Sequence, residues 1–245
     1  MIRLIGAFGL LAFAMLQMDS AQAQLQRRER RFDIWQIELG THVSKVPDRF
    51  VDYACGTGGN APSTQLRSFA DFMRCRPESS GLREVYFRYD DELEYWARAM
   101  ELEREINVYR GTQMYDYPVV VSVLVDPEGF VRGRRVVADQ RYPEIRERFE
   151  LWTLGNFLVQ RFTRTEWTCV DQEVEEGETP VGPDFVKVRC TKAKDGLRFL
   201  SEQRYFRKKG QMGIDPHTGK LEVQAFTSTS KFEMYMDPWG ERAGL

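Results

Sequence analysis

Four cysteines are the residues of this sequence whose type and spacing carry the clearest chemistry. They are Cys55, Cys75, Cys169 and Cys190, and an even number of cysteines is typical of disulfide bonding in an oxidising compartment. Among the three pairings that four cysteines allow, local spacing favours Cys55–Cys75 and Cys169–Cys190. Each bridge would close a loop of about 20 residues, worth roughly 3 kcal/mol in the chain-entropy model.

The second pair has further support from the chain around it. Strands are expected near 165–171 and 185–191, and Cys169 and Cys190 lie equally far from the tip of the hairpin that would join them. Opposed residues on antiparallel strands lie about 4.5–5.5 Å apart, which is within reach of a disulfide. A hairpin at this place therefore predicts this bridge.

Zinc or redox chemistry is the alternative use of the cysteines. The sequence contains no C-x-x-C, and His42 and His217 do not stand at a metal-ligand spacing with any cysteine pair. The sequence therefore predicts structural disulfides, with no metal site and no cofactor.

The common hydrolase motifs do not occur in the sequence. A Ser-His-Asp hydrolase needs a histidine base near its nucleophile, but His42 stands near an expected helix start and His217 in a turn. There is no G-x-S-x-G, H-E-x-x-H or EF-hand loop. A carboxylate pair stays open, because its two acids can be far apart in sequence. Candidates include Asp90, Asp91, Glu92 and Glu94. Capping of the following helix is the simpler role for this acidic cluster.

Two segments suggest ligands without matching the patterns of known ligand sites. The loop 56–63 (GTGGNAPS) has three glycines but lacks the Gly-Lys-Ser/Thr of a phosphate-binding loop and the spacing of a dinucleotide fingerprint. The run 204–209 mixes basic and aromatic residues, but strand alternation would divide these side chains between opposite faces. A net charge of −2 also gives no reason to expect nucleic acid as a partner.

The N-terminus has the pattern of an export signal. Arg3 precedes the apolar run Leu4–Leu16, and Ala21-Gln22-Ala23 forms an A-x-A cleavage site. The run has 13 residues, fewer than the roughly 20 that a membrane-spanning helix needs, and no later segment is long and apolar enough. We expect cleavage after Ala23, a mature chain that begins at Gln24, and a periplasmic or secreted protein. An uncleaved anchor or a buried N-terminal helix is the alternative.

Strands account for most of the secondary structure that should position these residues. Pro118–Val125 (PVVVSVLV) is nearly all apolar, which predicts a central strand buried on both faces. The turn sequence 126–129 (DPEG) leads to a partner strand over 130–138. Further strands are expected at 32–39, 50–55, 82–89, 165–171, 185–191, 198–207 and 220–236.

Three helices are expected between the strands. The first covers about 64–74, and the third runs from Pro143 to about 161. The second covers about 91–106, where one face is apolar and is expected to pack in the core. The residues of this face are Leu93, Trp96, Ala97 and Met100.

The order of elements predicts an α+β fold. Antiparallel sheets with a few packed helices, a C-terminal half that forms a β-meander, and stabilisation by disulfides are expected. The expected organisation is a signal peptide over 1–23, an N-terminal α+β unit over 24–140 and a C-terminal helix plus meander over 141–245, with one continuous domain as the alternative. With 16 Phe, 10 Tyr and 5 Trp, the chain has ample apolar surface for a core.

Part of the chain resembles a known family. Leu39-Gly40-Thr41, Val43 and Val46-Pro47, followed by a strand and a hydrophobic hairpin ending in Asp-x-x-Gly, resemble small envelope-assembly domains of the SmpA/BamE type over about a third of the chain. The cysteine-bearing segment between these parts departs from that pattern. The resemblance implies a scaffold role in the cell envelope.

These features favour binding over catalysis. The predicted function is an exported periplasmic protein that binds or scaffolds in the envelope, with an envelope protein, a peptide or a small ligand as partner. The alternative is an exported carboxylate-dependent hydrolase, which requires two carboxyl groups roughly 5–9.5 Å apart and one raised pKa. A sheet face is a candidate binding surface, although core packing is the simpler explanation for its rings. These rings belong to Tyr205, Phe226, Phe232 and Tyr235.

Overall fold

The computed structural model divides the chain into two compact units, Met1–Gln36 and Ile37–Leu245. The residues that it describes are 34–47, 50–60, 62–89, 92–102, 112–115, 117–140, 150–162, 165–214, 221–223 and 226–245. The predicted signal peptide therefore lies outside the described residues. In the first unit the structure describes one short 3-10 helix, η1 (Ile34–Gln36), and the rest of the fold belongs to the second unit.

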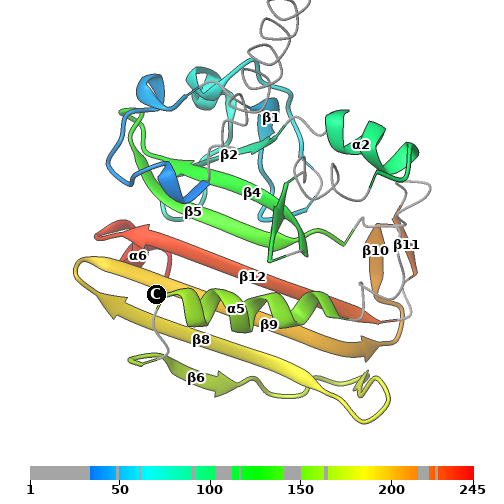
Figure 1. Cartoon of the computed structure of the whole chain (residues 1–245). Coiled ribbons are helices and arrows are strands. Elements are labelled where there is room, and N and C mark those ends of the chain that lie inside the picture. The colour runs from blue at the N-terminus through cyan, green and yellow to red at the C-terminus, as the bar shows by residue number, and fades with distance from the viewer. Residues whose placement is uncertain are drawn as a thin grey trace, which may run out of the picture. The chain divides into compact units, whose positions relative to one another are not determined.

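An antiparallel sheet dominates the second unit (Figure 1). Its main path consists, in spatial order, of β1 (Val51–Cys55), β2 (Arg83–Arg88), β4 (Tyr117–Val125), β5 (Val131–Ala138), β12 (Thr227–Met236), β9 (Leu197–Lys208), β8 (Val186–Lys194) and β6 (Thr168–Asp171). Two short strands pair beside this path, β3 (Gln113–Met114) with β4 and β7 (Glu178–Thr179) with β9. A separate two-stranded sheet consists of β10 (Met212–Ile214) and β11 (Leu221–Val223).

The helices that the structure describes in this unit are few and short. They are η2 (Val43–Lys45), η3 (Phe69–Arg74), α2 (Glu92–Ala99), η4 (Leu151–Thr153), α5 (Leu154–Arg161) and α6 (Trp239–Arg242). Within the described part of the chain, none of the helices has the length and apolar character that crossing a membrane requires. The predicted antiparallel sheet with few helices is confirmed, and the balance of the fold is mostly β.

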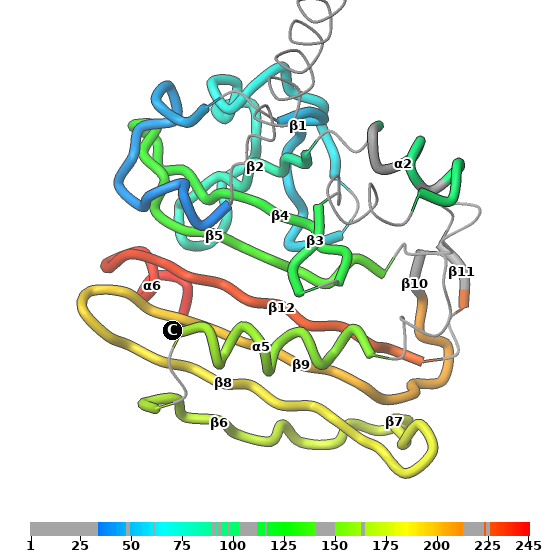
Figure 2. The backbone as a smooth tube through the Cα atoms, viewed as in Figure 1, coloured from blue at the N-terminus to red at the C-terminus, as the bar shows by residue number. Residues whose placement is uncertain are grey.

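The C-terminal strands follow one another in the sheet in chain order. β6, β8, β9 and β12 are neighbours in turn, and β12 then pairs with β5 (Figure 2). Strands from both halves of the chain therefore belong to one sheet, because β12 lies between β5 and β9.

The hairpin of β4 and β5 forms where the sequence predicts it. Val121 lies opposite Val136, and all residues from Val119 to Val125 are buried. The turn is closed by the N–H of Gly129, which donates to the carbonyl of Asp126 at 3.0 Å. Gly129 has φ +90°, and a Cβ there would lie 2.6 Å from Nε2 of His42, so this turn needs glycine for two reasons.

The two faces of the sheet differ in what they bury. On the face that carries Val121, Val136 and Phe232, α5 lies over β9 and β12 (Figure 1). Phe162, which follows α5, stacks on Phe232 with ring centroids 5.1 Å apart. We call this side of the sheet the helix-covered face. The opposite face carries Ser122, Arg135 and Glu233 on the same three strands, because successive residues of a strand point to opposite sides.

The strand predicted over 32–39 is wrong. Ile34–Gln36 form the 3-10 helix η1, and Ile37–Gly40 have no strand pairing. The carbonyl oxygen of Ile37 accepts a hydrogen bond from the guanidinium of Arg134, so a side-chain donor takes the place of a ladder partner. Alternation of apolar residues marks burial here, and Ile37 is buried, but it does not mark a strand.

The first predicted helix begins later than expected and is a 3-10 helix. η3 begins at Phe69, where the side chain of Ser68 accepts a hydrogen bond from the N–H of Ala70. The preceding residues 63–66 run beside β1 instead, with hydrogen bonds between the backbones of Cys55 and Thr64 and of Leu66 and Tyr53. These backbone groups are satisfied by β1, so the segment does not form a helix.

The apolar face predicted for the second helix does not pack in the core as a whole. Trp96 and Met100 are 50% and 61% exposed, whereas Ala97 is buried, and the side chain of Leu93 lies outside the described part. The helix α2 ends at Ala99, before Glu101 adopts a left-handed conformation with φ +56°. Residues 103–106 and 143–149 of the predicted helices also lie outside the described residues.

Candidate functional site

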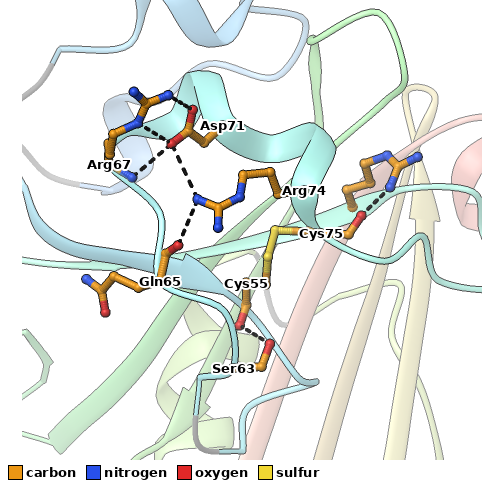
Figure 3. Close-up of a disulfide and its surroundings, with 8 residues drawn as sticks. Cys55, Ser63, Gln65, Arg67, Asp71, Arg74 and Cys75 are labelled. Atoms are coloured by element: carbon orange, nitrogen blue, oxygen red, sulfur yellow. Dashed lines mark hydrogen bonds and ion pairs between the residues drawn. A yellow bond between two sulfur atoms is a disulfide. The ribbon is translucent and has the colours of Figure 1, made fainter.

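Two disulfides tie local segments of the chain together. Cys55, the last residue of β1, is joined to Cys75, the residue after η3, with 5.2 Å between the Cα atoms (Figure 3). Cys169 and Cys190 lie directly opposite each other on β6 and β8 and form the second bond, with 4.0 Å between their Cα atoms. These are the pairs that local spacing favours, and they leave no free thiol in the chain.

The glycine-rich loop that follows Cys55 surrounds a carboxylate of the chain itself. The N–H of Gly58 donates to Oε2 of Glu84 at 2.7 Å, and the N–H of Gly56 donates to the backbone carbonyl of Glu84 at 3.0 Å. A Cβ on Gly56 would lie 2.2 Å from Cδ of Glu84, so only glycine allows this approach. The loop therefore does bind an anion through its backbone, but that anion is the side chain of Glu84.

Glu84 belongs to a buried ion cluster centred on one guanidinium. Arg135 donates from Nε to Glu233 at 2.5 Å and from Nη1 to Glu84 and Glu78, each at 2.6 Å. Nη2 of Arg135 lies 3.1 Å from Glu78 and 3.4 Å from the hydroxyl of Tyr235. The side chains of Arg135, Glu84 and Glu233 are each at most 6% exposed. We call these five residues the Arg135 cluster.

Burial and neighbouring charges shift the pKa values of Arg135 and Glu233 in opposite directions. Burial would lower the pKa of Arg135, but its hydrogen bond to Glu78 and the charges of Glu84 and Glu233 outweigh it and raise that pKa. Burial would raise the pKa of Glu233, but the charges of Arg135 and Lys231 hold it below its usual value. Burial, followed by the charge of Glu233, raises the pKa of Tyr235. The guanidinium of Arg135 and the carboxylate of Glu233 are therefore charged at neutral pH, and the hydroxyl of Tyr235 keeps its proton.

The lowered pKa of Glu233 predicts how the free energy of unfolding depends on pH. A carboxyl group with a depressed pKa in the folded state stabilises above its unfolded pKa, about 4.3 for Glu, and this contribution is lost as pH falls through the folded value. We expect Glu233→Gln to lower the free energy of unfolding more at pH 7 than at pH 3. Urea denaturation at both pH values measures the difference, and an equal loss at both would contradict it.

The Arg135 cluster was not predicted from the sequence. Its signal is the pair Arg134-Arg135 in the strand VRGRRVVA, beside the nearly all apolar strand 118–125, since a charge must be paired when it is buried. The sequence does not say which acids pair with it.

A polar groove lies on the other face of the sheet, opposite α5, toward its β6 edge. Its volume is about 540 Å³. The floor consists of residues 187–189 of β8 and 202–204 of β9, and one wall consists of residues 170–173 and 175, which run from β6 into the following loop. We call this feature the polar groove. The β-ladder of β8 and β9 supports its floor over their whole length.

One end of the polar groove is fixed by lysine–glutamate pairs. Nζ of Lys187 lies 3.0 Å from Glu175 and 3.0 Å from Glu178, and Lys208 approaches Glu175 at 2.5 Å. Hydrogen bonds from Lys208 and then Lys187 lower the pKa of Glu175 to about 2. These pairs hold the loop after β6 against the sheet.

The structure places the other sequence candidates in ordinary structural roles or outside its described part. Nδ1 of His42 accepts from the N–H of Ser44 and so caps η2, and the ring packs edge-on to Phe130. Tyr205, Phe232 and Tyr235 are buried, and Phe226 is half-buried, so these rings do not form an exposed surface. Outside the described part lie His217, Asp90, Asp91 and the side chain of Glu94. Glu92 begins α2 with an exposed side chain.

The carboxyl groups with shifted pKa values do not supply a general acid. A glycosidase-type mechanism needs a raised pKa, but the pKa values of Asp71, Glu166, Glu175 and Glu233 are all lowered. The described residues also contain no group of three or more His, Cys, Asp or Glu side chains placed to hold a metal ion.

The chain is a disulfide-bonded protein built on an antiparallel sheet, and it has a polar groove near one edge of that sheet. No protein-family model matches the chain, and neither a curated protein nor a solved structure matches it.

Proposed function

We propose that this chain is an exported protein that works by binding a partner in the cell envelope, and that the polar groove is its binding surface. The partner is an envelope protein or a peptide, with a small ligand as the narrower case. The observation that carries the proposal is the groove of about 540 Å³, whose size is typical of ligand sites.

The position of the polar groove supports this role. Its wall belongs to β6, the last strand at one edge of the sheet. In the ladder with β8, the N–H of Gln172 donates to the carbonyl of Lys187, so alternation turns the backbone groups of Cys169 and Asp171 away from β8. An extended segment of a partner can therefore contact the groove and the strand edge together.

Export is supported by the two disulfides and by the N-terminal pattern. Disulfides form and persist in oxidising compartments, and all four cysteines of this chain are paired. Residues 1–23 have the charged, apolar and small-residue regions of a signal peptide. The proposed location is periplasmic or secreted.

Site-specific photocrosslinking in cells tests the proposed function. A photoreactive residue at position 170 in the groove wall is expected to give a discrete adduct, whereas position 73 on η3 is not. Val170 and Met73 are equally exposed, at 54%, so the two positions form a matched pair. Mass spectrometry of the same preparation is expected to show a chain that starts at Gln24 and is four hydrogens lighter than its reduced form, two for each disulfide.

A charge reversal on the groove floor distinguishes a specific adduct from random capture. The adduct at position 170 should be lost in the double variant Arg189→Glu/Arg204→Glu and kept in Arg207→Glu. Arg207 is exposed on the same strand as Arg204, but strand alternation places it on the other face. Equal adducts from positions 170 and 73, or an adduct that survives the double variant, would contradict the proposal.

A further inference from the structure

Cationic side chains surround one residue pair in the floor of the polar groove. Val188 of β8 lies opposite Gln203 of β9, and both face the helix-covered side of the sheet. The side chains of their sequence neighbours therefore project on the groove side. These neighbours are Lys187, Arg189, Glu202 and Arg204, three cations and one carboxylate, and all four line the groove.

One of the three cations is already neutralised. Nζ of Lys187 is held between Glu175 and Glu178, and it also donates to the backbone carbonyl of Glu173 at 2.9 Å. Burial would lower the pKa of Lys187, but its hydrogen bonds to Glu178 and Glu175 outweigh this and raise that pKa. Lys187 therefore builds the groove wall and contributes little charge to a ligand.

The two arginines retain most of their capacity to bind an anion. Arg204 is half exposed and approaches Glu202 at 3.9 Å, which is longer than a hydrogen bond. Arg189 has no ion-pair partner among the described residues. In the register, Arg189 lies opposite Glu202 and Arg204 lies opposite Lys187, so the two arginines are diagonal neighbours within reach of one ligand.

We propose that Arg189 and Arg204 together bind an oxyanion of the ligand, a carboxylate or a phosphate group. This inference rests on the proposed function of the groove and names the chemistry that it recognises. The planar guanidinium presents paired N–H donors that match the oxygens of either group. In the wall, Glu175 is already paired with Lys187 and Lys208, and Glu173 adds a carboxylate whose charge disfavours a long polyanion.

Nuclear magnetic resonance of the arginine side chains tests this inference on the intact mature chain. The Nε–H signals of Arg189 and Arg204, assigned with Arg→Lys variants, are followed while inorganic phosphate or succinate is added at low ionic strength. Both signals are expected to shift and saturate with at least one probe. Arg189→Ala should weaken that binding by about tenfold or more, because a hydrogen bond to a charged group is lost. Arg207→Ala should leave it unchanged.

The outcomes separate this inference from the proposed function. Saturation with succinate alone identifies a carboxylate as the ligand group, and saturation with phosphate alone identifies a phosphate. Shifts that are linear in concentration and equal for all exposed arginines would overturn the oxyanion site. If the position-170 adduct forms while neither probe saturates, the groove binds a partner and only the oxyanion inference fails. If a probe saturates without any adduct, the oxyanion site stands and the proposed protein partner fails.

Discussion

Replacing Arg135 with methionine is expected to lower the free energy of unfolding at pH 7 by about 3–5 kcal/mol, the usual loss when one partner of a buried ion pair is removed. The substitution leaves Glu84 buried without a cation and leaves Glu233 with Lys231 as its remaining cation. Glu78, which also binds Arg135, is more exposed and can turn toward water. Urea denaturation at pH 7 measures the loss.

Two companion measurements separate an unpaired buried charge from lost packing. The triple variant Arg135→Met/Glu84→Gln/Glu233→Gln removes the buried charges with the cation and is expected to regain part of the stability. In Arg135→Met itself, the stranded carboxyl groups acquire raised pKa values, and their penalty disappears as pH falls through those values. The deficit against wild type should therefore shrink from pH 7 to pH 5. A loss below about 1 kcal/mol, or a triple variant no more stable than the single one, would contradict this account.

Removing the Cys55–Cys75 bond by a double alanine substitution is expected to cost about 3–5 kcal/mol, at the upper end for a native disulfide. Chain entropy supplies roughly 3 kcal/mol for a loop of this length. The rest follows from the position of the bond, since Cys55 and Cys75 are 5% and 2% exposed and their sulfur atoms leave a space in the core. The bond also fixes the loop that holds Glu84 (Figure 3).

The second disulfide provides a matched control for the first. Cys169–Cys190 spans 21 residues and Cys55–Cys75 spans 20, so the loop entropy is nearly equal in the two cases. Cys169 is exposed on the short edge strand β6, and its removal empties less of the core. We expect the double alanine variant at Cys169 and Cys190 to be more stable than that at Cys55 and Cys75 under identical denaturation conditions. If the variant at Cys169 and Cys190 were the less stable of the two, burial of a disulfide would not determine its contribution to stability.

Local patterns in the sequence were sufficient to predict those structural features that involve residues close together along the chain. The hairpin 118–138 follows from an apolar β-branched run, the turn sequence DPEG and a returning strand, and all three lie within about 20 residues. The opposition of Cys169 and Cys190 follows in the same way from their equal distance to the hairpin tip. In the hairpin of β4 and β5 the short turn sets the register, because it leaves the strands little freedom to slip.

The periodicity of apolar residues was not sufficient to predict burial where that burial depends on segments distant in the sequence. The alternation over 32–39 predicted a strand, but Ile34–Gln36 form a 3-10 helix and the carbonyl of Ile37 accepts from Arg134. The apolar face of the second helix predicted core packing, but Trp96 and Met100 are exposed. An apolar side chain is buried only if another element covers it, and a sequence pattern does not name that element.

The sequence by itself determined the antiparallel sheet with few helices and the local hairpins, because these depend on residue type and short spacing. Only the tertiary structure decided which charges meet. Arg135 pairs with Glu84, Glu78 and Glu233, which lie 51, 57 and 98 residues away along the chain. The polar groove likewise exists only because β6, β8 and β9 lie side by side, which brings Arg189 and Arg204 onto one floor. Contacts across such separations are set by the packing of the whole sheet.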